Sequence, residues 1–577
     1  MTRKKRALGV VVALVSALSV SACGLSPVPI EKPIQESHVQ EKDSVNATQA
    51  PSANVSDMAT ESGAQGMVPQ SDVYVPQDFN TEEYSSVEEQ GYVSTRANPL
   101  STVSADVDTA SYGNLRRMLY DGWKPAKDEG QTTQPEGQTT QPDVAEVTDD
   151  YSYYYGTGDK TIPKGAVRIE EMLNYFDYDY AGPKGDEKFG ITARMGKCPW
   201  NKDSELLVLG FATAKEDPAI REKGSNLVFL IDVSGSMKSA EKLPLLQGAF
   251  AKLVEKLGPN DVISIVTYSG SEKVVLDGAK GDQQRDIMSA IRELEAGGST
   301  NGEAGLRMAY DLAKKHFIEG GVNRIVMASD GDLNVGMSSE SDLHDFVEKQ
   351  RETGTYLSVL GFGKGNYKDT KMETLADHGN GSYHYIDSEQ EAERVFGDRL
   401  TANLVPFAND VKVQVEFNPA QIKGYRLVGY ENRKLNAEDF KDDTKDAGEV
   451  GPSSQFTVVY EVVTNDSAMD IPTPELKYED QAKDGNSTDW LTAKIRYKPQ
   501  DGSDVAEQAL AVGKDSWLED PGADWRFASA VTEFGMLLRN SKYRGTTDYN
   551  SVRGLVGQTE DPLRAEFLKL VDMAEQN

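Results

Sequence analysis

The sequence has little cysteine and little histidine, which excludes a disulfide-stabilised fold and a histidine-based zinc protease site. Of its 577 residues, two are cysteine and five are histidine. Two cysteines cannot form the dense disulfide framework of a small secreted domain, so hydrophobic cores must hold any folded part together. The histidines are scattered without the HExxH spacing of zinc proteases, which excludes that class of metalloenzyme.

Positive charge is also scarce. The chain carries 61 lysine and arginine residues against 93 aspartate and glutamate residues, a formal net charge of −32. Such a chain has no cationic surface that could displace counterions from phosphates, so nucleic acid is excluded as a partner. Broad contact with anionic lipid head groups is disfavoured for the same reason.

Long hydrophobic runs are missing except at the N-terminus. Residues 3–6 are basic, residues 7–20 are nearly all small or apolar, and Val20-Ser21-Ala22-Cys23 follows. This order is typical of a secretory signal peptide. The apolar run is too short for a comfortable membrane span of about 20 residues. We therefore predict a signal peptide over residues 1–22 rather than an uncleaved signal anchor.

The last four residues of this stretch resemble the lipobox of bacterial lipoproteins. In such proteins the cysteine thiol is acylated with diacylglycerol, and the cysteine becomes the mature N-terminus. The resemblance implies that Cys23 is lipidated and anchors the protein to the cell membrane at its extracytoplasmic face. Cys198 then has no partner, and we expect a small buried hydrophobic residue rather than a reactive thiol.

The chain divides into regions of different composition. Residues 23–95 are rich in Ser, Pro, Gln and Glu without periodicity, which predicts a disordered stalk. A structured α/β region is predicted over residues 96–220, with one helix capped at Asp108-Thr109. A disordered insertion near residues 124–160 interrupts this region, because the repeat EGQTTQP occurs there twice in tandem.

Apolar strands alternate with amphipathic helices between residues 225 and 405. This alternation predicts an α/β domain with a mainly parallel sheet and helices on both faces. The final helix of the domain is predicted over Ala392–Leu404. Beyond residue 408 the pattern becomes β-rich and then helical, so residues 408–577 are predicted to form a C-terminal α+β domain.

Oxygen-bearing side chains cluster in three predicted turns of the central domain. Two of these turns follow the apolar strands Leu227–Ile231 and Arg324–Ala328, and the third follows a glycine pair. In an open α/β sheet, ligands bind beyond the carboxyl ends of the strands. The candidate metal ligands are therefore Asp232, Ser234, Ser236, Thr300 and Asp330.

These five positions resemble the metal-ion-dependent adhesion site of the von Willebrand factor A (VWA) domain, whose fold is Rossmann-like. That motif has DxSxS after the first strand, a threonine in a Gly-rich loop and an aspartate after a later strand. The resemblance implies that Ser234 and Ser236 coordinate the ion directly. It implies direct or water-mediated coordination by Thr300, and largely water-mediated coordination by the two aspartates.

A weaker resemblance covers residues 96–577. It is to a bacterial lipoprotein family in which a VWA-associated N-terminal segment precedes the VWA domain and a C-terminal domain of unknown function. The segments NPLSTVSADVDTASY and VRIEEMLNYFDYDY carry the N-terminal part of the resemblance. It implies an architecture and no activity.

The donor set favours a hard divalent cation. All five side chains offer oxygen, and no histidine or cysteine is among them, so Mg²⁺ is the expected ion, with Mn²⁺ or Ca²⁺ as alternatives. Two aspartates balance its two charges, which leaves the ion electrophilic towards one further oxygen. In the VWA family that oxygen typically belongs to a glutamate or aspartate of a partner protein.

Together these features predict a binding protein and not an enzyme. The leading hypothesis is a membrane-anchored adhesion module that captures an unidentified protein through the partner's acidic side chain and a divalent cation. The alternative is a cell-envelope scaffold in which the metal site is secondary. An enzyme in residues 408–577 is the third hypothesis, and no GxSxG, phosphate-cradling loop or neighbouring nucleophile and base supports it.

Overall fold

The computed structural model describes residues 81–126, 160–214, 222–299, 302–331, 340–473, 488–500 and 503–577. The predicted signal peptide, the predicted lipidation site Cys23, most of the predicted stalk and nearly all of the predicted insertion lie outside these residues. No helix within the described ranges is both long enough and apolar enough to cross a bilayer.

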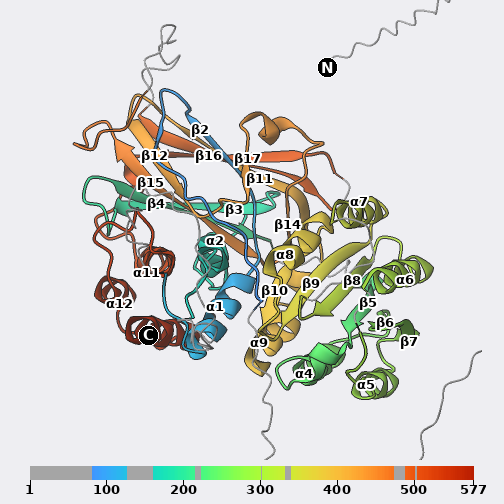
Figure 1. The fold of residues 1–577 in the computed structure, drawn as a ribbon. Coiled ribbons are helices and arrows are strands. Elements are labelled where there is room, and N and C mark those ends of the chain that lie inside the picture. The colour runs from blue at the N-terminus through green and yellow to red at the C-terminus, as the bar shows by residue number, and fades with distance from the viewer. Residues whose placement is uncertain are drawn as a thin grey trace, which may run out of the picture. The chain divides into compact units, whose positions relative to one another are not determined.

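The central α/β domain has a six-stranded sheet in the order β10-β9-β8-β5-β6-β7. All neighbouring strands are parallel except β6 and β7. One hydrophobic core lies on each face of the sheet, under the helices (Figure 1). The elements are β5 (Ser225–Asp232), η3 (Gly235–Lys238), α4 (Leu243–Val254), β6 (Val262–Tyr268), β7 (Glu272–Lys280), α5 (Gln284–Arg292), α6 (Gly302–Lys315), β8 (Val322–Ser329), α7 (Glu340–Arg351), β9 (Tyr356–Phe362), α8 (Asp369–His378), β10 (Tyr383–Ile386), α9 (Glu389–Glu393), η4 (Arg394–Asp398) and α10 (Leu400–Leu404). The predicted mainly parallel sheet between two helical layers is confirmed.

Two details of this domain differ from the prediction. Strand β7 was not predicted, because it is an exposed edge strand whose residues lack a clear buried face. The helix predicted over Ala392–Leu404 is wrong as a single element, since α9, the π-helical turn η4 and α10 replace it. Within η4, Arg394 donates a hydrogen bond to the carbonyl oxygen of Tyr175, so a contact with the N-terminal region accompanies the irregular turn.

The N-terminal and C-terminal regions interleave to form one β-sandwich. Its sheets have the orders β1-β12-β15-β4-β3 and β13-β2-β11-β16-β17, and they share a single hydrophobic core. The strands are β1 (Val93–Ser94), β2 (Leu100–Ser104), β3 (Phe189–Lys197), β4 (Glu205–Thr213), β11 (Ala408–Phe417), β12 (Ile422–Val428), β13 (Lys434–Leu435), β14 (Gly448–Val450), β15 (Gln455–Thr464), β16 (Asp489–Pro499) and β17 (Ala506–Gly513). The sandwich therefore joins segments from both sides of the α/β domain.

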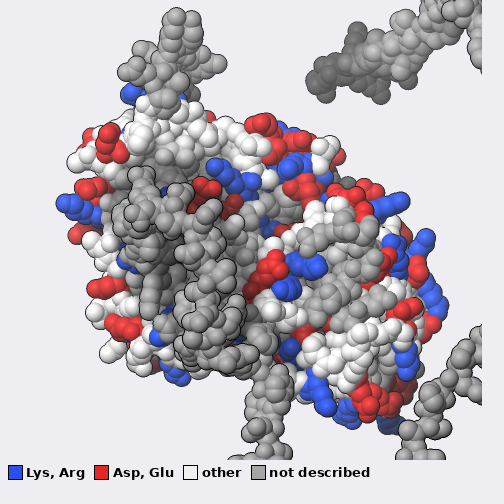
Figure 2. Space-filling model, viewed as in Figure 1, with Lys and Arg blue, Asp and Glu red and all other residues white. Residues whose placement is uncertain are grey.

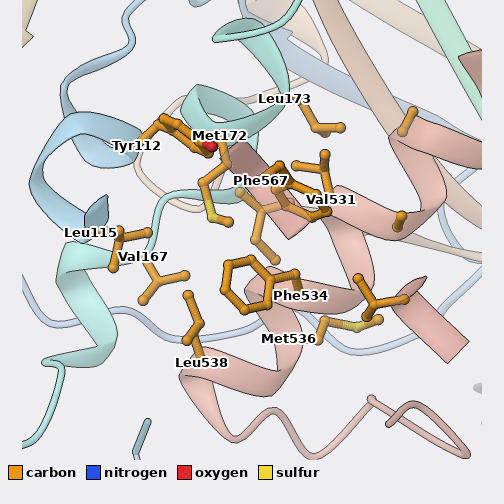
Figure 3. Packing of buried hydrophobic residues seen from close by; sticks show 14 of the residues in the cluster. Tyr112, Leu115, Val167, Met172, Leu173, Val531, Phe534, Met536, Leu538 and Phe567 are labelled. Atoms are coloured by element: carbon orange, nitrogen blue, oxygen red, sulfur yellow. The ribbon is translucent and has the colours of Figure 1, made fainter. Parts of the chain in front are cut away.

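A helical layer covers the outer face of the first of these sheets. It consists of α1 (Ala110–Tyr120), α2 (Ile169–Asn174), α11 (Ala523–Arg539), α12 (Tyr549–Val556) and α13 (Pro562–Gln576), with the short helices η2 (Lys164–Ala166), η5 (Glu438–Lys441) and η6 (Lys514–Ser516) elsewhere in the flanks. Figure 3 shows Met172 of α2, Phe534 of α11 and Phe567 of α13 packed within one buried cluster. Helices from both ends of the chain thus share a core as well.

The structure corrects two predictions for the N-terminal region. Residues 81–95 do not belong to a stalk, because Glu82 forms an ion pair with Arg117 and β1 pairs with β12. The cap predicted at Asp108-Thr109 is confirmed in position, because Thr109 is the N-cap residue of α1, but neither side chain caps the helix: Asp108 instead accepts a hydrogen bond from the backbone N–H of Tyr383 at 2.8 Å. In both places a contact with a distant part of the chain replaces the local structure that composition and capping rules indicate.

Buried ion pairs link the α/β domain to the sandwich. Arg168, which precedes α2, pairs with Asp369 of α8. Arg433, which precedes β13, pairs with Asp377 of α8 at 2.6 Å and with Asp108 at 3.2 Å. All these residues except Asp377 are largely buried, so guanidinium groups from two flanking segments hold one face of α8.

Candidate metal centre

The two candidate aspartates lie at the carboxyl ends of neighbouring parallel strands. Asp232 ends β5, and Asp330 directly follows β8, which pairs with β5 so that Ile231 lies opposite Ala328. The Ser329 hydroxyl donates a long hydrogen bond of 3.4 Å to Oδ2 of Asp232. The sheet itself therefore brings these two carboxylates to one edge, as the sequence predicted from the strand-end rule.

The turn after β5 presents the two candidate serines. The backbone N–H of Ser234 donates to Oδ1 of Asp232 at 2.8 Å, which fixes the orientation of that carboxylate. The hydroxyl oxygens of Ser234 and Ser236 lie 2.9 Å apart. Ser234 is buried and Ser236 is exposed, so the group opens to solvent on the Ser236 side.

The glycine-rich loop is held against this turn by backbone hydrogen bonds. Gly297 N–H donates to the carbonyl oxygen of Val233 at 2.8 Å, and Gly235 N–H donates to that of Gly298 at 3.1 Å. Gly298 has a φ of 87°, and a Cβ there would lie 2.5 Å from the Ser269 hydroxyl, so glycine is required. The loop is described up to Ser299, and the predicted ligand Thr300 lies outside the described residues.

The buried environment of Asp232 makes its negatively charged form energetically unfavourable. Burial, together with the nearby charge of Asp330, raises the pKa of Asp232 to about 6, although the hydrogen bonds from Ser234 act to lower it. The side chain is fully inaccessible to solvent. A carboxylate held in this way gains stabilisation from any cation brought close to it.

Lys242, which was not predicted as part of the site, supplies a cation to Asp330. Its Nζ donates to Oδ2 of Asp330 at 2.9 Å, and both residues are buried. The lysine stem lies over Gly363, where a Cβ would approach the lysine Cε to 2.2 Å. Nothing in the local sequence marks this lysine, because the contact joins the start of α4 to the end of a distant strand.

The described residues of the site fit a hard divalent cation in their chemistry. They offer two carboxylates and two hydroxyls, and an oriented carboxylate next to exposed hydroxyl oxygens is suited to Mg²⁺. Among the residues that the structure describes, no group of three or more His, Cys, Asp or Glu side chains is arranged to hold a metal ion. The serine hydroxyls would therefore have to supply part of the coordination here.

Cys198 lies away from this site, in the core beneath the sandwich. It is 3% exposed, and burial, followed by the charge of Glu461, raises the pKa of its thiol. The thiol thus has the buried, protonated character expected from the sequence.

Three family models match the chain. The von Willebrand factor type A domain matches residues 226–398, the C-terminal domain of the uncharacterized protein YfbK matches residues 402–576, and a family described as von Willebrand factor matches residues 78–131 and 155–208. The first two matches leave only a few residues between them.

Similar solved structures include a von Willebrand factor type A protein from Catenulispora acidiphila, with 14% identity, coverage of 62% of this chain and 80% of that chain, and a TM-score of 0.36. Another is the ArnB paralog VWA2 from Sulfolobus acidocaldarius, with 17% identity, coverage of 67% and 97%, and a TM-score of 0.34.

Two protein relatives differ in how much of the chain they match. Inter-alpha-trypsin inhibitor heavy chain H3 of Mesocricetus auratus is 30% identical over 202 residues, which are 33% of this chain and 22% of that protein. The uncharacterized protein YfbK of Escherichia coli (strain K12) is 36% identical over 512 residues, which are 86% of this chain and 81% of that protein. Since this second match extends over most of both lengths, the chain belongs to the bacterial VWA-domain family that includes YfbK of Escherichia coli.

Proposed function

We propose that this protein is anchored by lipid to the extracytoplasmic face of the cell membrane and captures a protein partner through a divalent cation. The observation that carries the proposal is the meeting of Asp232, Ser234, Ser236 and the strand end that bears Asp330 at one edge of the VWA sheet. The match to a VWA domain supports binding of a partner protein.

Each described side chain has a distinct role in this proposal. Ser234 and Ser236 offer hydroxyl oxygens to the ion, and Asp232 supplies a buried negative charge that its backbone contact keeps oriented. Asp330 supplies the second negative charge, shared with Lys242. The ion, when bound, provides an electrophilic centre for one carboxylate of the partner. Mg²⁺ is the proposed ion, and Thr300 is its proposed further ligand.

Calorimetric titration of the full-length chain with magnesium chloride, in detergent, tests the metal. Asp232→Asn and Ser236→Ala should abolish heat from Mg²⁺ uptake. Asp286→Asn and Ser289→Ala are matched controls, because both residues are exposed on α5 of the same domain, and they should bind as the unaltered chain does. Absence of uptake by the folded, unaltered protein would refute the metal centre.

Crosslinking in cells tests the capture of a partner. The proposal expects at least one protein that is crosslinked in magnesium, lost in EDTA and lost with Asp232→Asn, while Asp286→Asn retains it. A set of crosslinks that is identical in all four conditions contradicts capture through the ion.

Cys23→Ala should move the protein from the membrane fraction to the soluble fraction, and retention in the membrane would refute the lipid anchor.

A cell-envelope scaffold is the second candidate function. The interleaved sandwich and the buried ion pairs at Arg168 and Arg433 support it, because they join the VWA domain rigidly to large flanking regions. A strain carrying Ser234→Ala and Ser236→Ala separates the two functions. Normal envelope integrity in that strain, with a defect only when the whole protein is removed, would favour the scaffold.

A further inference from the structure

A cavity of about 470 Å³ lies where α1 meets the VWA domain. Its lining comes from the end of α1, from the loop after β9 and from the residues that follow β10. Figure 1 shows α1 beside β10 and α9 at one side of the VWA sheet. The N-terminal region therefore adds a wall to the binding edge of the VWA domain.

One side chain connects this cavity to the candidate metal centre. Glu241 and Gly363 both line the cavity. Lys242 follows Glu241 in the chain and packs over Gly363, while its Nζ reaches Asp330. A partner segment whose carboxylate lies at the metal centre would thus have its neighbouring residues close to the cavity.

The basic residues of the cavity are already neutralised. Each of its three cations is paired with a carboxylate: Arg116 with Asp387, Arg117 with Glu82, and Lys364 with Asp121. The lining itself holds four carboxylates against these three cations. An anionic ligand would have to break one of these ion pairs, so the charges disfavour an anion.

Two groups of the lining remain available to a ligand. Glu241 is half-buried and has no hydrogen bond or ion pair within the described parts of the chain. Tyr120 is 58% exposed, the largest value for a big hydrophobic side chain within the described residues. A free carboxylate near an open aromatic ring is suited to a cation, which gains both a charge partner and a cation–π contact.

We propose that this cavity binds a lysine or arginine side chain of the partner segment whose acidic residue reaches the metal centre. The pairing rests on the proposed function, whereas the cavity's preference for a cation does not. The chain's net charge of −32 favours approach of a segment that is basic outside its one required carboxylate. An extended chain advances about 3.3 Å per residue, so the two side chains should lie a few residues apart.

Saturation-transfer NMR with N-acetyl-arginine amide tests the cavity without any metal. The probe should receive saturation from the unaltered full-length chain and from Glu255→Gln, an exposed control in the same domain. Glu241→Gln and Tyr120→Ala should each lower the signal at least threefold. An equal signal in all four proteins would overturn the proposal. It would also be overturned if N-acetyl-glutamate amide gave a stronger signal than N-acetyl-arginine amide and Glu241→Gln left that signal unchanged.

Fluorescence polarisation with labelled peptides tests the pairing. Each peptide carries one aspartate and one arginine separated by one to four glycines, and the reference peptides carry citrulline in place of arginine. In magnesium, at least one spacing should bind about tenfold more tightly with arginine, and Glu241→Gln should remove that preference alone. Magnesium-dependent binding without any arginine preference refutes the pairing. Binding that ignores magnesium and Asp232→Asn refutes instead the proposed function.

Discussion

Replacing Asp232 with asparagine should stabilise the metal-free protein while it abolishes metal binding. Burial and the charge of Asp330 raise the pKa of Asp232 to about 6 from an ordinary value of 3.8. Because the folded protein holds this proton more tightly than the unfolded chain does, its stability falls as the pH rises from about 4 to about 6. That difference in pKa corresponds to about 3 kcal/mol of destabilisation at pH 7.5.

Asparagine preserves the contacts of the carboxylate without its charge. Its Oδ1 can still accept from the Ser234 N–H, and its Nδ2 can donate towards the Ser329 hydroxyl. We therefore expect Asp232→Asn to gain up to about 3 kcal/mol at pH 7.5 in EDTA, and to gain nothing near pH 4. If the proposed metal centre is correct, this loss of stability is what a charged ligand for the cation requires.

The assay must report on the VWA domain itself. All five tryptophans lie outside residues 225–405, so tryptophan fluorescence follows the flanking regions instead. Hydrogen exchange measured by mass spectrometry on peptides from β5 and β8 gives the local free energy of opening. Exchange that is unchanged or faster in Asp232→Asn at pH 7.5 would refute the reasoning, as would an equal gain at pH 4.

Four further outcomes are expected. Lys242→Met should raise the affinity for Mg²⁺ by on the order of tenfold, because a competing positive charge is removed, whereas Lys242→Arg should leave the affinity unchanged. Equal calorimetric affinities of Lys242→Met and the unaltered protein would contradict this. Arg433→Met should lower the free energy of unfolding in urea by about 3–5 kcal/mol, since buried carboxylates lose their cation, and a loss under about 1 kcal/mol would argue against a stabilising role of the Arg433 ion pairs. Burial raises the pKa of Glu171 to about 8, helped by the charges of nearby carboxylates and opposed by Arg168. The free energy of unfolding should therefore fall as the pH rises from about 4.5 to about 8, and Glu171→Gln should reduce this dependence of the urea midpoint on pH. Cys198 should react with a thiol reagent only after unfolding in urea, and rapid labelling of the native protein would show that the core opens.

The sequence predicts the features that depend on short-range periodicity. Strands β5 and β8 contain the buried apolar runs Leu227–Ile231 and Ile325–Ala328, and the ends of these runs follow from the polar residues and glycines that come after them. Since parallel strands end at one edge of a sheet, the proximity of Asp232 and Asp330 follows from those two runs alone. The site was thus predictable wherever it depends on strand ends.

Features that depend on contacts between distant segments were missed. The pairing of Lys242 with Asp330 and the contact between Asp108 and Tyr383 join residues that no local pattern relates. Strand β7 was missed for a different reason, because an exposed edge strand has no continuous apolar face to reveal it. Tertiary packing decides the first two cases, and solvent exposure decides the third.

The acidic character of the chain is dispersed on the face that Figure 2 displays. Acidic and basic side chains alternate over the described surface there, without one extended patch of either sign. We therefore expect local groups, such as Glu241 and the proposed metal centre, to select the partner, and the overall charge to act mainly on the rate of approach.

The interleaved strands also set the order in which the protein can fold. Leu100 lies opposite Glu416, so β2 gains its neighbour only after the whole VWA domain has been synthesised. The VWA domain pairs its own strands within one continuous stretch of chain and is free to fold first. Until β15 is synthesised, β4 can pair only with β3, and until β11 is synthesised, the facing sheet lacks its central strand. A nascent chain of this architecture therefore leaves one edge of β4 without its partner strand while residues 214–454 are synthesised, and an unpaired strand edge is a template for pairing with another chain.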